Sequence, residues 1–242
     1  MSEEKKKILN LYAGIGGNRK LWGDDVEVTA IEIISDIASE YKYRYPNDEV
    51  IQTDSHQFLL HNFQKYDFIW SSPPCPSHSR LCFSQKEKRY AEMSLYQQII
   101  LLKSWFKGKW VVENVVPYYE YLIKPNIIIG RHPYWSNFKI EPLEVKNIDV
   151  SRSTKEELSE YLGMPIPRIN AGELLRNCVE PKVGKHIFDC AWADFNKNFE
   201  QKTLFDACKQ CLQVTVAIRQ VAEYGLRTYQ VAQPIEREMN FE

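Results

Sequence analysis

The chain has 242 residues, of which 44% are hydrophobic, 26% charged and 13% aromatic, and its formal net charge is −1. This profile is typical of a globular protein and excludes disordered, collagen-like and coiled-coil classes, while the near-neutral charge excludes a globally basic nucleic-acid binder. The length predicts one large domain, or one domain with a small appendage. No apolar run approaches the roughly 18 residues of a membrane helix, and the N-terminal sequence MSEEKKK argues against a secretory signal. We therefore expect a cytoplasmic protein whose six cysteines are reduced thiols.

Strand-like and helix-like segments alternate in the first half of the chain. Strand patterns cover residues 7–12, 26–31, 50–51, 66–70 and 110–112, and helix-like patterns run to residue 41 and over residues 93–106. This alternation predicts an α/β fold with a mostly parallel sheet and helices on both faces. After residue 138 the pattern weakens, and the helices expected there cover residues 155–162, 183–192 and 204–224.

Three glycines, Gly14, Gly16 and Gly17, follow the first strand directly. Glycines at such a place let the backbone turn tightly and approach a ligand. Glu32 ends the next strand 18 residues after Gly14, where a carboxylate commonly binds ribose hydroxyls, and Asp54 ends the third strand. Because ligands of open α/β sheets bind at the carboxyl ends of the strands, this pattern predicts a nucleoside cofactor site. The alternatives are a plain strand–helix turn for the glycines and a helix N-cap for each acid.

The sequence Pro73-Pro74-Cys75 ends the fourth strand, and Glu113-Asn114 ends the fifth. Two prolines hold the backbone in a stiff extended turn, which presents the thiol at the sheet edge. A thiolate nucleophile and an acid that lie at the same crevice suit covalent catalysis with proton donation. The alternatives are a buried, inert cysteine and a glutamate satisfied by neighbouring backbone amides.

Three segments carry a family resemblance: LYAGIGG at residues 11–17, SPPC at 72–75 and VENV at 112–115. They occur in the order and approximate spacing of the cytosine-5 DNA methyltransferases, and the sequence resembles a short, phage- or bacterial-type member. The match covers residues 8–138 well, and RNCVEPKVG at 176–184 is similar to the family's last motif, which returns to the cofactor pocket. The resemblance implies a Rossmann-like S-adenosylmethionine-dependent methyltransferase fold with a reduced target-recognition segment.

The resemblance also implies the cofactor, S-adenosylmethionine, and how it is held. The glycine turn would bind the methionine part, Tyr12 would pack on the adenine, Glu32 would bind the ribose hydroxyls and Asp54 the adenine amino group. The residues expected at the cofactor are Tyr12, Ala13, Gly14, Gly16, Gly17, Glu32, Ile33, Asp54, Ser55, Pro73, Asn177 and Val179.

The implied reaction is methylation of cytosine at C5. Cys75 would attack C6 of a cytosine that has left the duplex, and Glu113 would contact N3 and the exocyclic amine. C5 would then take the methyl group and lose its proton as the thiol is expelled. The family has an arginine pair near residue 131, one of which approaches the base; here Arg131 is a single arginine with His132 next to it, and a surface ion pair is its alternative role.

Residues 80–92 follow the nucleophile and would close over double-stranded DNA. Basic side chains in this loop are expected to contact phosphates, namely Arg80, Lys86, Lys88 and Arg89, although a solvated charged loop is the alternative. We divide the chain into a catalytic region at 1–138, a reduced target-recognition segment at 139–175, and a return to the catalytic domain with a helical tail at 176–242. So short a recognition segment favours a short or relaxed DNA recognition sequence. The alternative is that recognition of the sequence is shared with a homodimer partner or a specificity partner.

Three rival functions remain open on the sequence. They are a methyltransferase that acts on exocyclic amino groups, an RNA cytosine-5 methyltransferase, and a catalytically idle nucleic-acid-binding relative. Cys208 and Cys211, with Cys178 and Cys190, suggest a zinc site, but their helical apolar context favours helix core, so no metal is expected. A role in restriction-modification, in protection of phage DNA or in regulation is equally open.

Overall fold

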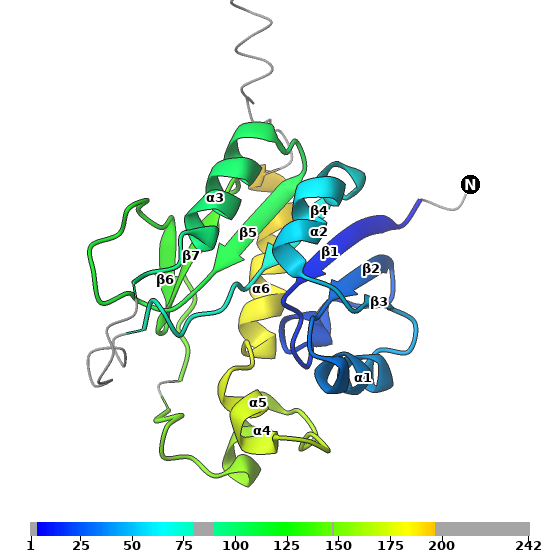
Figure 1. Ribbon diagram of the computed structural model, residues 1–242, viewed down its shortest axis with the longest axis vertical. Helices are drawn as coiled ribbons and strands as arrows, with labels where there is room; N and C mark the ends of the chain where they lie inside the picture. The colour runs from blue at the N-terminus through cyan, green and yellow to red at the C-terminus, as the bar shows by residue number, and fades with distance from the viewer. Residues whose placement is uncertain (1–3, 80–89, 147, 197–242) are drawn as a thin grey trace, which may run out of the picture. The chain divides into compact units, whose positions relative to one another are not determined.

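The computed structural model describes residues 4–79, 90–146 and 148–196 (Figure 1), and the structural statements below concern these ranges. They fall within one compact unit, Met1–Gln201. Several predicted features lie outside the described residues: Arg80, Lys86, Lys88, Arg89, the helix at 204–224, and Cys208 and Cys211. Within the described ranges no helix has both the length and the apolar character needed to cross a bilayer.

A seven-stranded sheet forms the centre of this unit (Figure 1). Its strands are β1 (Lys6–Leu11), β2 (Val26–Ile31), β3 (Glu49–Ile51), β4 (Phe68–Ser71), β5 (Lys109–Glu113), β6 (Ile127–Ile129) and β7 (His132–Ser136). Their order is β3-β2-β1-β4-β5-β7-β6, and every pairing is parallel except those that β7 makes. The predicted α/β fold with a mostly parallel sheet is confirmed, and each of the five predicted strands is present.

The strand order reverses between β1 and β4. The chain first moves outward from β1 to β2 and β3, and then returns to the other side of β1 to form β4 and β5. At such a switch point the connections leave in opposite directions and open a crevice at the carboxyl ends of the strands. The segments after β1 and β4, which begin at Tyr12 and Ser72, therefore both start at this crevice.

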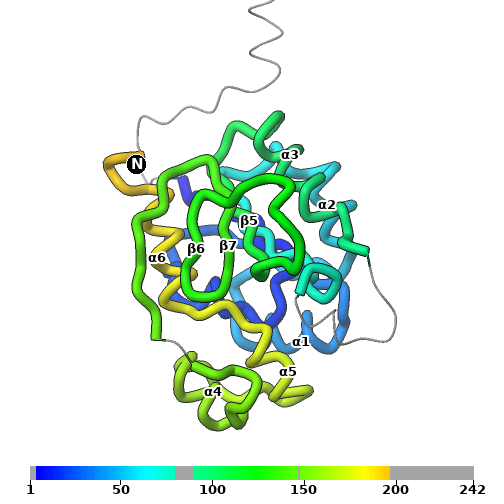
Figure 2. The backbone as a smooth tube through the Cα atoms, turned by 90° about the vertical axis from the view of Figure 1, so that its left-hand side faces the viewer, coloured from blue at the N-terminus to red at the C-terminus, as the bar shows by residue number. Residues whose placement is uncertain are grey.

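Helices cover both faces of the sheet. They are α1 (Ser35–Arg44), α2 (Ser55–Asn62), α3 (Ser94–Trp105), α4 (Lys155–Leu162), α5 (Ala171–Arg176) and α6 (Pro181–Trp192), with short 3-10 turns η1 (Asn18–Leu21), η2 (Phe63–Lys65) and η4 (Asp194–Asn196). Alternate residues of β1 point to opposite faces, so that Ile8 packs in the cluster with α6 and Leu9 in the cluster with α2 and α3. Figure 2 shows α6 on one side of the sheet and α2 and α3 on the other.

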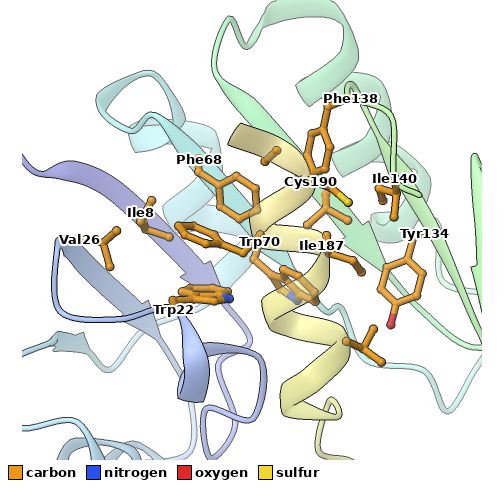
Figure 3. Packing of buried hydrophobic residues seen from close by; sticks show 14 of the residues in the cluster. Ile8, Trp22, Val26, Phe68, Trp70, Tyr134, Phe138, Ile140, Ile187 and Cys190 are labelled. Carbon is orange, nitrogen blue, oxygen red and sulfur yellow. The ribbon is translucent and has the colours of Figure 1, made fainter. Parts of the chain in front are cut away.

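The core beneath α6 is rich in aromatic side chains. Trp22 stacks on Phe188 with ring centroids 5.1 Å apart, and Phe68 meets Phe188 edge-on at 5.4 Å. Figure 3 shows Trp22, Phe68, Trp70 and Ile187 gathered between the strands and the helix. Large buried aromatic rings contribute much apolar burial, and this cluster fixes α6 against the sheet.

Helices α4 and α5 form a small unit with its own apolar cluster. Leu158, Leu162 and Leu175 are buried there together with Ile15 from the loop after β1. A capping box starts α4: the Thr154 side chain accepts from the Glu157 amide, and Glu157 accepts from the Thr154 amide. The predicted helix at 155–162 is confirmed, and it belongs to a unit that packs on the glycine turn.

Polar contacts tie the same unit to α1. Arg168 Nε donates to Glu40 Oε2 at 2.8 Å, and Arg44 donates to the Pro165 carbonyl at 3.1 Å. Glu40 is 2% exposed and also pairs with Arg44 at 2.7 Å, so two guanidinium groups hold the pKa of its carboxyl below the usual value against the effect of burial. Part of the segment at 139–175, which was expected to recognise the target sequence, is therefore bound to α1.

Candidate active site

The turn after β1 has a strained and open backbone. Tyr12 has a φ of 55°, an uncommon left-handed value for a residue with a side chain, and Gly14 has a φ of 54°. A Cβ added at Gly14 would meet no atom within 4 Å, so the backbone is open to a ligand there. The structure thus forms the cradle that the glycine pattern predicts.

Gly17 closes the other side of the turn. A Cβ at this position would collide with Cys178 Sγ and with the Val179 carbonyl oxygen. The segment at 176–184 therefore returns to the glycine turn, as its likeness to the family's last motif implies. Asn177, the C-cap of α5, is exposed next to this contact.

Glu32 links the glycine turn to the start of α1. Its Oε2 accepts from the Gly14 amide at 3.1 Å and its Oε1 from the Ile34 amide at 3.0 Å, and the residue is 8% exposed. Each carboxylate oxygen can accept a further hydrogen bond, so two ligand hydroxyls could still be bound. Ile33 follows it with 57% of its surface exposed, which gives the site an apolar wall.

The end of β3 joins the same site. Ser55 Oγ accepts from the Tyr12 amide at 3.1 Å, while Asp54 Oδ1 accepts from the Gln57 amide at 2.7 Å as the N-cap of α2. The helix N-cap considered for Asp54 is therefore present in the structure, and its role at the adenine stays a prediction. Burial raises the pKa of Tyr12 to about 12, and its hydroxyl accepts from Gln98 at 2.8 Å.

These residues fit S-adenosylmethionine. The open backbone at Gly14 suits the methionine end, the acceptors at Glu32 suit ribose hydroxyls, and the exposed side chain of Ile33 suits an adenine face. Ala13 is buried behind the turn, where its amide donates to the Ile31 carbonyl at 3.0 Å and helps to hold the turn against β2.

The turn that carries Cys75 is held from two sides. The Cys75 carbonyl accepts from the amides of His78 and Ser79, each at 3.0 Å, which fixes the turn itself. Asn114, at the end of β5, is 2% exposed and donates from Nδ2 to the Pro73 carbonyl at 2.9 Å. The Cys75 side chain is half-buried, unlike the fully enclosed cysteine of the inert alternative. The structure therefore fixes the turn of Cys75 directly to the strand that ends in Glu113.

Glu113 lies at the carboxyl end of β5, next to His132 at the start of β7. His132 Nε2 is 3.8 Å from Glu113 Oε1, and the two side chains are 25% and 10% exposed. Burial lowers the pKa of His132; the Glu113 carboxylate opposes this shift and the Arg131 guanidinium adds to it. In the sequence His132 is only a neighbour of Arg131, because nothing local indicates that it faces Glu113.

Arg131 is exposed in the turn between β6 and β7. Its Nη2 donates to the Arg176 carbonyl at 3.4 Å, which joins this turn to the end of α5. Arg131, His132, Tyr161 and Arg176 all line a cavity of about 80 Å³ between the β6–β7 turn and the α4–α5 unit. A direct role of Arg131 at the base stays a prediction.

Among the described residues, no group of three or more His, Cys, Asp or Glu side chains is arranged to hold a metal ion. Cys178 is partly buried against the glycine turn, where desolvation raises its pKa to about 12, and Cys190 is buried in the α6 core. The pair at Cys208 and Cys211 lies outside the described ranges.

Comparisons with known sequences find one matching family and two relatives. The family model described as C-5 cytosine-specific DNA methylase matches residues 6–117. The chain is 36% identical over 80 residues to tRNA (cytosine(38)-C(5))-methyltransferase of Spodoptera frugiperda, covering 31% of this chain and 24% of the relative. It is 29% identical over 84 residues to the Homo sapiens protein of the same name, covering 32% of this chain and 22% of that one. The chain thus spans about a quarter of the length of the curated relatives it matches.

Three similar solved structures show the range of likeness. A mutant of Spodoptera frugiperda DNMT2 is 27% identical with a TM-score of 0.34, covering 46% of this chain and 36% of that chain. The putative methyltransferase yhhF from Escherichia coli is 18% identical with a TM-score of 0.35, covering 54% and 74%. SMU.776, a putative methyltransferase complexed with SAH, is 16% identical with a TM-score of 0.34, covering 46% and 31%.

The family match confirms the resemblance that three short motifs carried, and it spans both the glycine turn and the strand ends at Cys75 and Glu113. The predicted cofactor, S-adenosylmethionine, is confirmed with it. Residues 6–117 thus match the C-5 cytosine-specific DNA methylases, a family of S-adenosylmethionine-dependent methyltransferases.

Proposed function

We propose that this protein transfers a methyl group from S-adenosylmethionine to C5 of cytosine in double-stranded DNA. One observation carries the proposal: the hydrogen bond from Asn114 to the Pro73 carbonyl fixes the turn of Cys75 against the end of β5, where Glu113 lies. A nucleophile and an acid are thereby held at the carboxyl ends of neighbouring parallel strands, beside the cradle that fits the cofactor.

The chain's own residues divide the chemistry. The Cys75 thiolate adds to C6 of a cytosine that has left the base stack, while the Glu113 carboxyl gives a proton to N3, so that C5 becomes electron-rich. The bound cofactor supplies the methyl group that C5 receives. The C5 proton then leaves, the bond between Cys75 and C6 breaks, and N3 returns its proton to Glu113.

The cofactor side of the site has separate duties. Glu32 binds the ribose hydroxyls while it holds the Gly14 and Ile34 amides, and this couples cofactor binding to the shape of the turn. Gly14 leaves room for the methionine part to approach the backbone. Pro73, which is buried, supports the wall between this cradle and Cys75.

RNA is the second candidate substrate, and a specific observation favours it. The two curated relatives are named as tRNA (cytosine(38)-C(5))-methyltransferases, whereas the family model is described for DNA. Both substrates use the same attack at C6, so the geometry around Cys75 and Glu113 serves either.

The test measures methyl transfer from labelled S-adenosylmethionine to plasmid DNA and to total tRNA in parallel, followed by bisulfite sequencing of whichever is labelled. We expect label in DNA, as 5-methylcytosine. Label confined to tRNA would replace DNA with RNA as the substrate, and label on an exocyclic amino group would overturn the proposal. The control is the Cys75→Ala protein, in which neither substrate should be labelled.

A further inference from the structure

The contact between His132 and Glu113 follows from the antiparallel pairing of β7 with β5. Glu113 is directly opposite Tyr134, and His132 precedes Tyr134 by two residues, so all three side chains lie on the same face of the sheet. The diagonal pair places His132 Nε2 3.8 Å from Glu113 Oε1. This distance is too long for a hydrogen bond but allows an ion pair when the imidazole is protonated.

The surroundings keep this imidazole neutral near pH 7. Glu113 of β5 and Arg131 of the preceding turn are the charged groups that act on it, and burial outweighs the favourable effect of Glu113 on its pKa. The other titratable groups around the adjoining cavity are Lys146, Tyr161, Arg176, Cys178 and Glu180, with Tyr134 beneath. Of these, Glu180 is engaged by the Tyr161 hydroxyl, which donates to it at 2.6 Å.

We propose that His132 is the positioning residue of Glu113: the neutral imidazole leaves the carboxyl able to exchange a proton with N3 of the cytosine, and the imidazolium pairs with the carboxylate and withholds it from the base. This inference rests on the proposed cytosine chemistry. Glu113 must be free to reach N3 when the bond from Cys75 to C6 forms, and an imidazolium 3.8 Å away would attract the carboxylate by ion pairing instead.

A histidine here behaves differently from an arginine. A guanidinium carries its charge at every working pH, whereas an imidazole changes charge between about pH 5 and 8. Arg131, the one arginine between residues 127 and 136, is exposed and donates from Nη2 to the Arg176 carbonyl. The side chain beside Glu113 is therefore that of His132. On this proposal, protonation of His132 makes methyl-transfer activity fall at acidic pH; we call this fall the acidic limb of the pH profile.

The experiment measures kcat/KM for the nucleic acid against pH, because this ratio reports groups of the free enzyme. In the wild type we expect activity to fall at a pH below the ordinary imidazole value of about 6.5, because burial lowers the pKa of His132, and one proton of the slope should be due to this residue. His132→Gln should lose that proton from the slope while retaining activity near neutral pH, well short of the roughly 100-fold or larger loss expected when a general acid is removed. His132→Arg should have, at every pH, the low kcat/KM that the wild type shows at acidic pH. Its KM for S-adenosylmethionine should be unchanged.

His186→Gln is the matched control, since this imidazole lies on α6 and its Nε2 contacts the Glu141 carbonyl at 2.8 Å. It should keep the wild-type acidic limb. An unchanged slope in an active His132→Gln protein, or loss of the limb in the control, would overturn the role of His132.

A titration of the wild type needs no variant to fold. The imidazole resonance of His132, followed by NMR, should have the same midpoint as the acidic limb, and a clear mismatch would overturn the inference. Failure of the proposed function looks different, because the wild type would then methylate cytosine in neither DNA nor RNA at any pH.

Discussion

At the residue scale, the proposed chemistry requires Cys75 to be the nucleophile that bonds to C6 of the cytosine. In DNA with 5-fluorocytosine at the target, fluorine at C5 cannot leave as a proton does, so the bond between Cys75 and C6 should persist. We predict a denaturant-stable protein–DNA complex with the wild type and its loss in Cys75→Ala, measured on a denaturing gel. A complex that survives in Cys75→Ala would assign the nucleophile to another residue.

Two carboxylates of similar burial should behave in opposite ways. Glu113→Gln should lose most methyl transfer yet bind S-adenosylmethionine normally in calorimetry, because the proposed chemistry uses its carboxylate at the base and not at the cofactor. Glu32→Ala should instead weaken cofactor binding by roughly 10- to 100-fold, the scale of one or two lost hydrogen bonds to a charged group. Each variant serves as the control for the other, and normal cofactor binding by Glu32→Ala would remove Glu32 from the site.

At the scale of elements, the return of the chain before α6 depends on a glycine that has no space for a side chain. Gly17→Ala would drive a Cβ into the Val179 carbonyl and Cys178 Sγ, so the segment must move away. Overpacking of this kind costs about 1–3 kcal/mol, which corresponds to a Tm lower by roughly 2–12 °C in a protein of this size. We expect weakened cofactor binding as well, because the glycine turn moves with the segment.

The control for this change is Gly172→Ala within α5. A Cβ there would meet only the end of the Arg176 side chain, at 3.2 Å, and alanine favours helix by about 0.5–1 kcal/mol. Its Tm, measured by calorimetry beside Gly17→Ala, should stay level or rise. Equal losses in both proteins would show that the contact at Gly17 is not what holds the segment.

At the scale of the whole molecule, the length of the DNA recognition sequence should depend on how many side chains of the segment at 139–175 are free to contact bases. Arg168 is engaged by Glu40, and the apolar side chains of α4 and α5 pack on Ile15, so few groups remain to read base edges. Each well-placed side chain discriminates a base pair by about 1–3 kcal/mol, and we therefore predict a recognition sequence of roughly two to four base pairs.

Methylome sequencing of cells that express the protein measures this directly, with Cys75→Ala as the background. A strictly required site of six or more positions would contradict the prediction for the isolated chain. The reading would then be shared with the loop at 80–92, with the C-terminal tail, or with a second copy or a specificity partner.

Elements with a local signal could be predicted from the amino-acid sequence. β1, β2, β4 and β5 are mostly apolar runs buried on both faces of a parallel sheet, and such runs stand out without any knowledge of their neighbours. The helix starting at Pro181 shows both a proline at its first turn and a clear apolar face. Because functional residues of an open α/β sheet follow the ends of its strands, Cys75, Glu113 and Glu32 could be chosen from the same patterns.

Contacts between distant segments could not be predicted in this way and follow from the folded arrangement of the chain. β6 has three residues and β7 contains Pro133, so neither carries a convincing strand signal, yet their pairing is what sets His132 beside Glu113. The bond from Asn114 to Pro73 joins residues 41 apart, and the bond from Arg168 to Glu40 joins residues 128 apart. Such contacts arise from sheet register and close packing rather than from local propensity, and for that reason no pattern in the sequence announces them.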